Sequence, residues 1–467
     1  MLATVTDPDV LQGYLTDASN IHGHAEALVR PATAEEVAEV VAHCQKGGIP
    51  LTVTAGRTST TAAPVPFGGW LLSTERLDAV RSIDHDTATA QAGVFLGAFQ
   101  DEIEAQGRLY PPDPTSRWEC TLGATIACNA SGARTFRYGP TRPWIQALEV
   151  VTARGERIRV ERGQPIPEDW PVPEWHEPEV KTAAGYAPPQ DALDVFIGQE
   201  GTLGVITEAT LRLTDLPEAV IGVMAWFPDR DTALDFMEQA RAAVRAEAYG
   251  AVSPRAIEYL DDACLTIARE RVGEVPEGAH AALFCEQEVE PSHGEETHLE
   301  AWWALLEQTG ALADDTLIAT DPPTQERLHI LRHAIPAGIN EQAVANGMPK
   351  VGTDLAVPDD GLRRMMDLYE AAPIEHVLFG HLGNNHLHLN MLPTTEDELK
   401  QARDYYKTLS REAVALGGSV SGEHGIGKLK KDYLAMMVDE ETLASFRRLK
   451  AWFDPAWILG RGTMFDR

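Results

Sequence analysis

Residues 197–207 read Ile-Gly-Gln-Glu-Gly-Thr-Leu-Gly-Val-Ile-Thr, and this stretch decides the fold. Gly198, Gly201 and Gly204 recur at every third position, and β-branched residues follow them. Glycine lets another backbone or a ligand approach the main chain closely, because it has no Cβ. Ordinary core packing does not require so many small residues, so the pattern indicates a turn and strand that lie against something large.

Three more small-residue stretches precede this one. They read Thr-Ala-Gly-Arg-Thr-Ser-Thr-Thr over 54–61, Pro-Pro-Asp-Pro-Thr-Ser over 111–116, and Cys-Thr-Leu-Gly-Ala-Thr-Ile-Ala-Cys-Asn-Ala-Ser-Gly over 120–132. The first lies between two apolar runs, where successive amides and hydroxyls could wrap a pyrophosphate. By itself it is equally well a polar surface turn. All four together favour binding of a large flat ligand.

A histidine-rich stretch runs from residue 379 to residue 390 as Phe-Gly-His-Leu-Gly-Asn-Asn-His-Leu-His-Leu-Asn. Polar and apolar residues alternate from His386 onward, so a strand would place His386, His388 and Asn390 on one face. A polar strand face inside a protein needs a reason, and metal binding is one.

Residues 421–427 read Ser-Gly-Glu-His-Gly-Ile-Gly, in which the glycines allow a tight turn to present Glu423 and His424. Two histidines and a glutamate with an open coordination position are a common ligand set for catalytic zinc or manganese. The plainer alternative is that these groups are hydrogen-bonded polar core residues.

Composition limits the classes of partner. The 467 residues include 39 Lys and Arg against 71 Asp and Glu, which gives a net charge of −32 with neutral histidine. Such a field repels nucleic acid and anionic membranes, so we expect neither as a partner. The five cysteines form no CxxC pair, which argues against an iron–sulfur cluster. No leader-like or membrane-spanning segment is apparent, so we expect a cytoplasmic protein, either free or peripheral to a membrane.

The predicted pattern of helices and strands differs between the two parts of the chain. Thr33 and Glu36 predict a capping box, and Val37, Val40, Val41 and Cys44 predict one apolar helix face before a strand at 49–53. Strands are also predicted within 148–160 and 193–213, with the Pro-rich segment 163–180 as a long loop. Beyond Leu216, strands at 220–227 and 281–289 alternate with long helices. We therefore place a domain boundary near residue 215.

The ordered set of these stretches resembles a known family. From about Tyr14 to the C-terminus the sequence is similar to the vanillyl-alcohol oxidase and p-cresol methylhydroxylase superfamily, in particular to its D-lactate dehydrogenase, D-2-hydroxyglutarate dehydrogenase and glycolate oxidase branch. The resemblance implies an α+β fold. A two-part FAD-binding domain of the p-cresol methylhydroxylase type would span 1–215. A substrate domain with an antiparallel sheet and a metal site would span 216–425, and residues 426–467 would return to the FAD domain.

The resemblance implies noncovalent FAD bound by the four small-residue stretches, although His22 and His24 lie where some superfamily members attach flavin covalently. The expected FAD-binding residues are Ala55, Gly56, Arg57, Thr58, Ser59, Thr60, Thr61, Pro112, Asp113, Thr115, Ser116, Gly123, Thr125, Asn129, Ser131, Gly132, Gly201, Thr202, Val205 and Ile206. Arg57, Ala62 and Ala63 stand where the family commonly has glycine.

The resemblance also assigns a catalytic centre. It places a divalent metal, zinc or manganese, on His381, His388 and Glu423, with His424 as the proton-abstracting base. Arg332 would grip the substrate carboxylate, unless it is a solvated helix residue, and we add Asn390 to the catalytic set. Lys350 is a weaker candidate. Between the two histidines the family reads Leu-Gly-Asp-Gly-Asn-Leu, whereas this chain reads Leu-Gly-Asn-Asn-His-Leu; the change removes a carboxylate and adds His386.

The expected activity is oxidation of a D-2-hydroxy acid such as D-lactate, glycolate or D-2-hydroxyglutarate to the 2-oxo acid, with hydride transfer to flavin N5. No GxGxxG stretch follows a predicted strand, so electrons would pass to a quinone, an electron-transfer flavoprotein or a partner subunit, rather than to NAD. A homodimer is compatible with the sequence. Two alternatives remain: a flavin-binding subunit without catalysis, and a metal-dependent hydrolase that leaves the N-terminal half unexplained.

Overall fold

The structure is a computed structural model that describes residues 3–247, 249–273 and 275–467. The chain forms two compact units, which are described separately. Unit 1 consists of residues 1–132, 139–216 and 420–467, and unit 2 consists of residues 133–138 and 217–419. Glu423 and His424, which the predicted division at residue 425 assigns to the substrate domain, therefore belong to unit 1.

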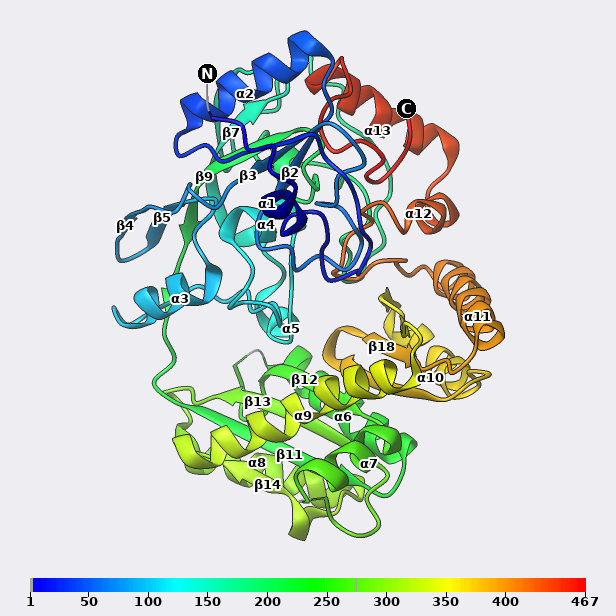
Figure 1. Ribbon diagram of the computed structural model, residues 1–467. Coiled ribbons are helices and arrows are strands. Elements are labelled where there is room, and N and C mark those ends of the chain that lie inside the picture. Colours follow the sequence, from blue (N-terminus) through cyan, green and yellow to red (C-terminus); the bar gives the residue numbers. More distant parts are fainter. Residues whose placement is uncertain (1–2, 248, 274) are drawn as a thin grey trace. The chain divides into compact units, whose positions relative to one another are not determined.

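Unit 1 is built on two main sheets and mixes parallel and antiparallel pairing (Figure 1). The first sheet is parallel, in the order β1 (Ala27–Val29), β3 (Trp70–Ser73), β2 (Leu51–Thr54). The second is antiparallel, in the order β4 (Val80–Ile83), β5 (Thr87–Gln91), β9 (Gly204–Arg212), β7 (Ile145–Thr152), β8 (Arg157–Glu161). Short strands β6 (Arg108–Leu109) and β10 (Thr214–Asp215) pair with each other. The helices are α1 (Pro8–Gln12), α2 (Ala34–Gly47), α3 (Leu96–Glu104), α4 (Leu122–Ala127), α12 (Lys431–Met437) and α13 (Glu440–Phe453).

Helix α2 shows how closely local pattern predicts structure here. Val37, Val40, Val41 and Cys44 are all buried in one core cluster, as the helical spacing predicts. Thr33 accepts the Glu36 N–H at 3.2 Å, but the Glu36 carboxylate accepts from Ala32 N at 2.7 Å rather than from Thr33. The predicted capping box is therefore only half right, because the side chain reaches one residue further back.

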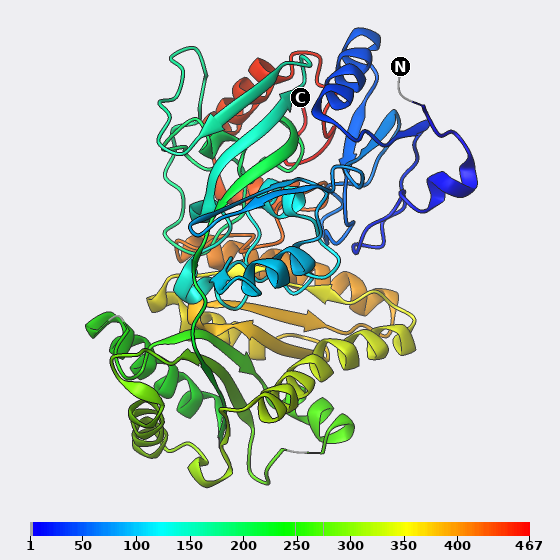
Figure 2. The same cartoon turned by 90° about the vertical axis from the view of Figure 1, so that its left-hand side faces the viewer.

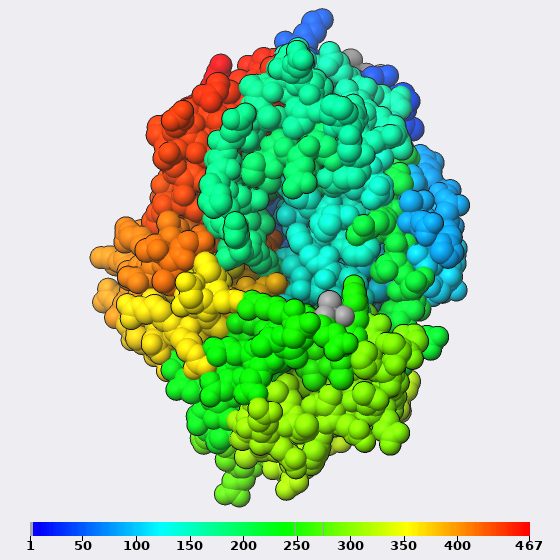
Figure 3. All heavy atoms as spheres, turned by 180° about the vertical axis from the view of Figure 1, so that it is seen from behind, coloured from blue at the N-terminus to red at the C-terminus, as the bar shows by residue number. Residues whose placement is uncertain are grey.

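The C-terminal segment completes unit 1. Ile458 O accepts from Leu51 N at 2.7 Å, and Leu51 O accepts from Gly460 N at 3.0 Å, so the segment pairs along β2. The buried Lys450 ammonium donates to Thr202 O at 2.6 Å and to Leu459 O at 2.9 Å. In Figure 3 the red C-terminal residues lie on the surface beside blue-green residues of the same unit. The return of the chain to the first domain is thus fixed by hydrogen bonds.

Unit 2 is centred on one antiparallel sheet. The order is β14 (Leu317–Ala319), β11 (Val220–Phe227), β13 (Ala281–Glu288), β12 (Pro254–Leu260), β17 (His376–His381), β18 (His386–Met391), β15 (Val351–Gly352), and β16 (Leu355–Ala356) also pairs with β18. The helices are α5 (Thr135–Tyr138), α6 (Arg230–Ala246), α7 (Asp262–Arg271), α8 (Gly294–Thr309), α9 (Pro322–Asn346), α10 (Leu362–Glu370) and α11 (Glu396–Ala415). This mixed α+β architecture with an antiparallel sheet agrees with the sequence expectation.

Helix α9 packs on the sheet of unit 2 (Figure 2). Leu328, Leu331 and Ile335 are buried with Met224 and Phe284 of the strands. Pro336 lies inside α9 and has no N–H, so the Arg332 carbonyl receives no helical hydrogen bond from it. The helix therefore lacks one backbone hydrogen bond, the one that the Arg332 carbonyl would accept.

Among the described residues, no helix is both long enough and apolar enough to cross a bilayer. The five cysteines are free thiols, and Cys44, Cys120, Cys264 and Cys285 are buried.

Candidate functional site

The four small-residue stretches come together inside unit 1. Gly198 N and Glu200 N donate to Ile126 O at 3.0 Å and Ala127 O at 2.8 Å, so the 197–207 stretch is hydrogen-bonded to α4 in the third stretch. A Cβ on Gly132 would lie 2.1 Å from Asp113 O, which shows how tightly the second and third stretches pack. These glycines serve close approach of one backbone to another.

The loop between β2 and β3 contains two residues in the left-handed region. Arg57 has φ 58° and Ala62 has φ 60°, at two of the three positions where the resembled family commonly has glycine. Non-glycine residues pay a steric cost there, which glycine does not. The loop thus keeps a glycine-adapted backbone although its sequence has departed from glycine. The Arg57 guanidinium also lies 4.8 Å from the centre of the Tyr14 ring.

Glu200 ties three segments of unit 1 together. Its carboxylate accepts from Ile426 N at 2.8 Å and from Gly427 N at 2.7 Å. Lys428 N donates to Thr61 O at 2.8 Å, so the 421–427 turn also joins the β2–β3 loop. Burial raises the pKa of Glu200 to about 7, although the two amide donors oppose the shift.

Two buried hydroxyls of this region fit a polar ligand such as FAD. Thr54 Oγ1 ends β2 just before the loop, and Thr121 Oγ1 precedes α4. Both atoms are buried and have no hydrogen-bond partner among the described residues. A buried hydroxyl without a partner costs free energy, and a bound ribityl or phosphate group would satisfy it.

Glu423 and His424 lie in the same turn. Lys181 Nζ contacts Glu423 Oε2 at 2.7 Å, and Ser131 Oγ lies 3.5 Å from the same oxygen. The His424 ring is about one-third exposed, and its Nε2 lies 3.8 Å from Glu423 Oε1. The sequence reasoning missed Lys181, because an isolated lysine directly after a Pro-rich loop gives no signal.

In unit 2, the histidine-rich stretch forms the hairpin of β17 and β18. Cross-strand pairing sets His381 opposite His386 and Phe379 opposite His388, which places the three histidines on one face. The ring centres of His386 and His388 are 4.6 Å apart, and both lie within 5.6 Å of the His381 ring centre. The predicted single face is confirmed, and His381 joins it from the neighbouring strand.

Each histidine of this cluster is held by a hydrogen bond from outside it. His381 Nδ1 lies 2.6 Å from Glu258 Oε1, and His388 Nδ1 lies 3.1 Å from Thr353 O. His386 Nε2 lies 2.8 Å from Asp354 Oδ1, with both side chains fully buried. One ligand nitrogen from each of the three rings lies within 4.8 Å of the others. Imidazoles anchored through one nitrogen fit a metal centre that uses the other nitrogen.

The altered string at 384–386 is supported by its own contacts. Asn385 has φ 51°, where the family has glycine, and asparagine tolerates this region better than most residues. Its side chain contacts Arg241 at 2.8 Å and Asp359 at 2.8 Å. His386 is anchored by Asp354. Two of the three changed positions are therefore built into the hairpin, whereas Asn384 Oδ1 is buried and has no hydrogen-bond partner among the described residues.

Arg332 does not stand in solvent as an unattached helix residue. Its Nη2 lies 3.2 Å from Glu258 Oε2, and its guanidinium carbon lies 5.8 Å from the centre of the Phe284 ring. Its side chain is 25% exposed. Asn390 is buried on β18 and donates to His388 O at 3.1 Å. Lys350 is exposed just before β15.

The sequence reasoning missed Glu258 and Asp354, the two carboxylates that hold His381 and His386. A glutamate inside the β-run Arg-Ala-Ile-Glu-Tyr-Leu (255–260) was the available signal, because a charge in a buried strand needs a partner. Its partner lies 123 residues further along the chain, which no local pattern reveals.

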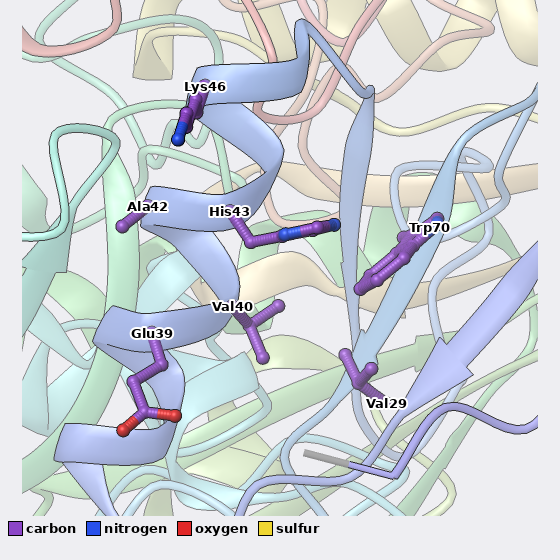
Figure 4. A pocket seen from close by; sticks show the side chains of 7 residues that line it. All are labelled: Val29, Glu39, Val40, Ala42, His43, Lys46 and Trp70. Atoms are coloured by element: carbon purple, nitrogen blue, oxygen red, sulfur yellow. The ribbon is translucent and has the colours of Figure 1, made fainter. Parts of the chain in front are cut away.

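A surface pocket of unit 1 lies apart from the predicted stretches in sequence (Figure 4). His43 of α2 stacks on Trp70 of β3, with ring centres 4.9 Å apart. The other lining residues are Val29, Glu39, Val40, Ala42 and Lys46. None of them is among the residues expected to bind FAD or metal.

Comparison with known proteins agrees with this architecture. The family described as FAD linked oxidases, C-terminal domain, matches residues 216–464, and an FAD binding domain family matches residues 25–161. The D-2-hydroxyglutarate dehydrogenase of Xanthomonas citri pv. viticola is 31% identical over 94% of this chain and 89% of its own length. Glycolate oxidase subunit GlcD of Bacillus subtilis is 29% identical over 95% of this chain and 89% of its own length.

A solved structure of alkyldihydroxyacetonephosphate synthase matches with a TM-score of 0.70 at 17% identity, covering 98% of this chain and 82% of that one. At this identity the match speaks for the fold alone. Because the C-terminal domain family covers more than half of the chain and a relative above 30% identity spans nearly all of it, the chain belongs to the FAD-linked oxidases, with an FAD-binding domain of the p-cresol methylhydroxylase type.

Proposed function

We propose that this protein oxidises a D-2-hydroxy acid to the corresponding 2-oxo acid and passes the electrons to an acceptor other than NAD. The family assignment supports flavin chemistry, and the names of relatives such as D-lactate dehydrogenase and D-2-hydroxyglutarate dehydrogenase support the substrate class. The chain adds no GxGxxG stretch after a strand that would suit NAD.

The observation that carries the proposal is the arrangement in unit 2 of an anchored histidine cluster and a partly buried arginine that share one glutamate. His381 and Arg332 contact the two oxygens of one glutamate. A 2-hydroxy acid presents a hydroxyl and a carboxylate on neighbouring carbons, which suit a metal and a guanidinium respectively.

The proposed metal ligands are His381, His388 and Glu423, with zinc or manganese as the ion. The donor set of two neutral imidazoles and a carboxylate suits either metal. When bound, the metal lowers the pKa of the substrate hydroxyl and FAD accepts the two electrons that leave the carbon. Lys181 shares the Glu423 carboxylate at 2.7 Å and balances part of its charge.

The remaining roles fall to side chains of the protein. His424 takes the proton of the substrate hydroxyl at its ring, since an imidazole titrates near neutral pH. Arg332 binds the carboxylate by paired N–H donors, which fixes the orientation of the α-hydrogen. Asn390 lies on the strand face that carries His386 and His388, and we assign it to substrate positioning.

We further propose that FAD is held noncovalently by the four small-residue stretches of unit 1. The partnerless hydroxyls of Thr54 and Thr121 support a polar ligand there. Acid or heat denaturation should release the flavin into the supernatant. Flavin that stays with the denatured chain would instead indicate covalent attachment, for which His22 and His24 are candidates.

An anaerobic screen of hydroxy acids tests the proposed activity. The yellow protein is mixed with D-lactate, glycolate, D-2-hydroxyglutarate and the L-enantiomers, and flavin absorbance is followed. We expect bleaching by at least one D-2-hydroxy acid or glycolate, with the L-enantiomers slower. A flavin that none of these compounds bleaches would contradict the proposal.

The second candidate is a flavin-binding subunit without catalysis of its own. The observation that favours it is the string Asn384, Asn385 and His386, which replaces the family pattern. Asn385 and His386 are anchored by their contacts, which a catalytic centre also requires. The same screen separates the two candidates. A metal-dependent hydrolase has no support from a family of oxidoreductases.

A further inference from the structure

Glu258 is a buried glutamate in the middle of β12, between β13 and β17 of the unit 2 sheet. Its side chain is 6% exposed, and each carboxylate oxygen has its own partner. Oε1 lies 2.6 Å from His381 Nδ1, and Oε2 lies 3.2 Å from Arg332 Nη2. One carboxylate therefore joins a proposed metal ligand to the proposed anchor of the substrate.

The contact with His381 selects a tautomer. An ionised carboxylate only accepts hydrogen bonds, so His381 Nδ1 carries the hydrogen and donates it to Glu258. Nε2 then carries the lone pair with which His381 would bind a metal. A carboxylate behind a ligating imidazole also raises its basicity and fixes its ring plane. His388 reaches the same tautomer by a different route, because its Nδ1 lies against Thr353 O.

The contact with Arg332 orients the guanidinium. Arg332 projects from α9 at the point where Pro336 removes a helical hydrogen bond, and its long side chain would otherwise have several rotamers. Glu258 accepts from Nη2, at one edge of the guanidinium fork.

We propose that Glu258 is a positioning residue that holds His381 in its metal-binding tautomer and Arg332 in its carboxylate-binding orientation at the same time. The carboxylate and the hydroxyl of a 2-hydroxy acid stand on neighbouring carbons, so the groups that would bind them need a fixed separation, and a single rigid bridge between His381 and Arg332 provides it. The inference rests on the proposed function, since it takes the metal and the 2-hydroxy acid from there.

A merely structural ion pair would look similar in the fold, so the test reads metal affinity rather than stability alone. The full-length protein is stripped of metal, and binding of Zn²⁺ and Mn²⁺ is measured by competition with a chromophoric chelator. Glutamine has one acceptor oxygen in place of two. In Glu258→Gln, if the amide oxygen accepts from His381, the amide N–H₂ faces the N–H donors of Arg332, and no hydrogen bond forms there. We expect Glu258→Gln to bind the metal about 10–100-fold more weakly and to raise KM for the hydroxy acid.

Two matched controls isolate this role. Asp261→Asn makes the same carboxylate-to-amide change three residues further on, at a buried group that accepts from Cys264 N and Leu378 N. It should leave metal affinity unchanged. Arg332→Lys should raise KM while metal affinity stays at the parent value, which separates the two arms of the bridge.

The outcomes distinguish the inference from the proposed function. A parent protein that binds neither Zn²⁺ nor Mn²⁺ overturns the proposed metal site and the inference with it. A parent that binds metal, with Glu258→Gln binding it equally well, overturns the inference alone. If Glu258→Gln does not fold, Glu258→Asp keeps the charge on a shorter side chain and should weaken metal binding by the same mechanism; parent-like affinity in that folded variant overturns the inference.

Discussion

His424 is the residue whose substitution separates catalysis from binding. A positioned general base contributes about 10²–10⁴-fold in rate, so His424→Ala should slow flavin reduction by roughly that factor. FAD content should be unchanged, because the hydrogen bond from Thr61 Oγ1 to residue 424 goes to the backbone oxygen. Anaerobic stopped-flow absorbance with the best hydroxy acid of the screen measures the rate.

The control for this prediction is His386→Ala. His386 is anchored by Asp354 and has no base counterpart in the resembled family, so its loss should slow reduction less than that of His424. If His386→Ala reduces the flavin far more slowly than the parent while His424→Ala reduces it at the parent rate, the base is His386.

Ala62 and Ala63 offer a test of backbone strain at neighbouring positions. Ala62 has φ 60°, whereas Ala63 is not among the residues with positive φ. Glycine at 62 relieves roughly 1–2 kcal/mol of steric cost, which offsets the buried methyl group and the added entropy of the unfolded chain. Ala62→Gly should therefore stay within about 0.5 kcal/mol of the parent, while Ala63→Gly should lose about 0.4–1 kcal/mol. Urea unfolding measures both, and an equal loss in the two variants would contradict the strain.

At the scale of elements, the buried Glu200 carboxylate, which joins its own segment to the turn at Ile426 and Gly427, predicts a pH dependence of stability. The folded pKa of Glu200 is about 7, against 4.5 for an unperturbed glutamate, so the folded state binds more protons between these values. Stability should therefore fall as pH rises from about 4.5 to 7, by roughly 3 kcal/mol in total from this group. Glu200→Gln removes the titration and should flatten that part of the curve.

Unfolding by urea at intervals between pH 5 and 8 measures this dependence. Glu441→Gln, at an exposed position in the first turn of α13, is the control and should retain the parent slope. A Glu200→Gln variant that also retains the parent slope would assign the dependence to another group.

Elements with a strong local pattern could be predicted from the sequence, and long-range partners could not. The apolar spacing of α2, the strands β11 and β13, and the alternation in β18 were all visible, because periodicity is a local property. The bridge from Glu258 to His381 and Arg332 was not, since its members come from β12, β17 and α9. The site roles of Glu423, His424 and Arg332 came from resemblance and stay predictions.

At the scale of the whole molecule, the net charge of −32 opposes capture of the proposed substrate, which is itself an anion. In unit 2, arginine side chains form ion pairs with neighbouring glutamates. Arg134 and Arg255 lie against Glu286 at 3.3 Å and 2.7 Å, and Arg332 lies against Glu258. The cationic contacts act over a few ångströms, whereas the excess negative charge acts over the Debye length.

We therefore expect kcat/KM for an anionic substrate to rise when salt is first added. The Debye length falls from about 30 Å at 0.01 M to about 8 Å at 0.15 M ionic strength, which screens the long-range repulsion more than a partly buried ion pair. We expect kcat/KM for the D-2-hydroxy acid to rise at least about twofold over this range. The uncharged methyl ester of the same acid should show no such rise. Steady-state assays with a neutral artificial acceptor measure both, and a kcat/KM for the acid that falls steadily from the lowest salt would mean that local cations dominate the approach of the substrate.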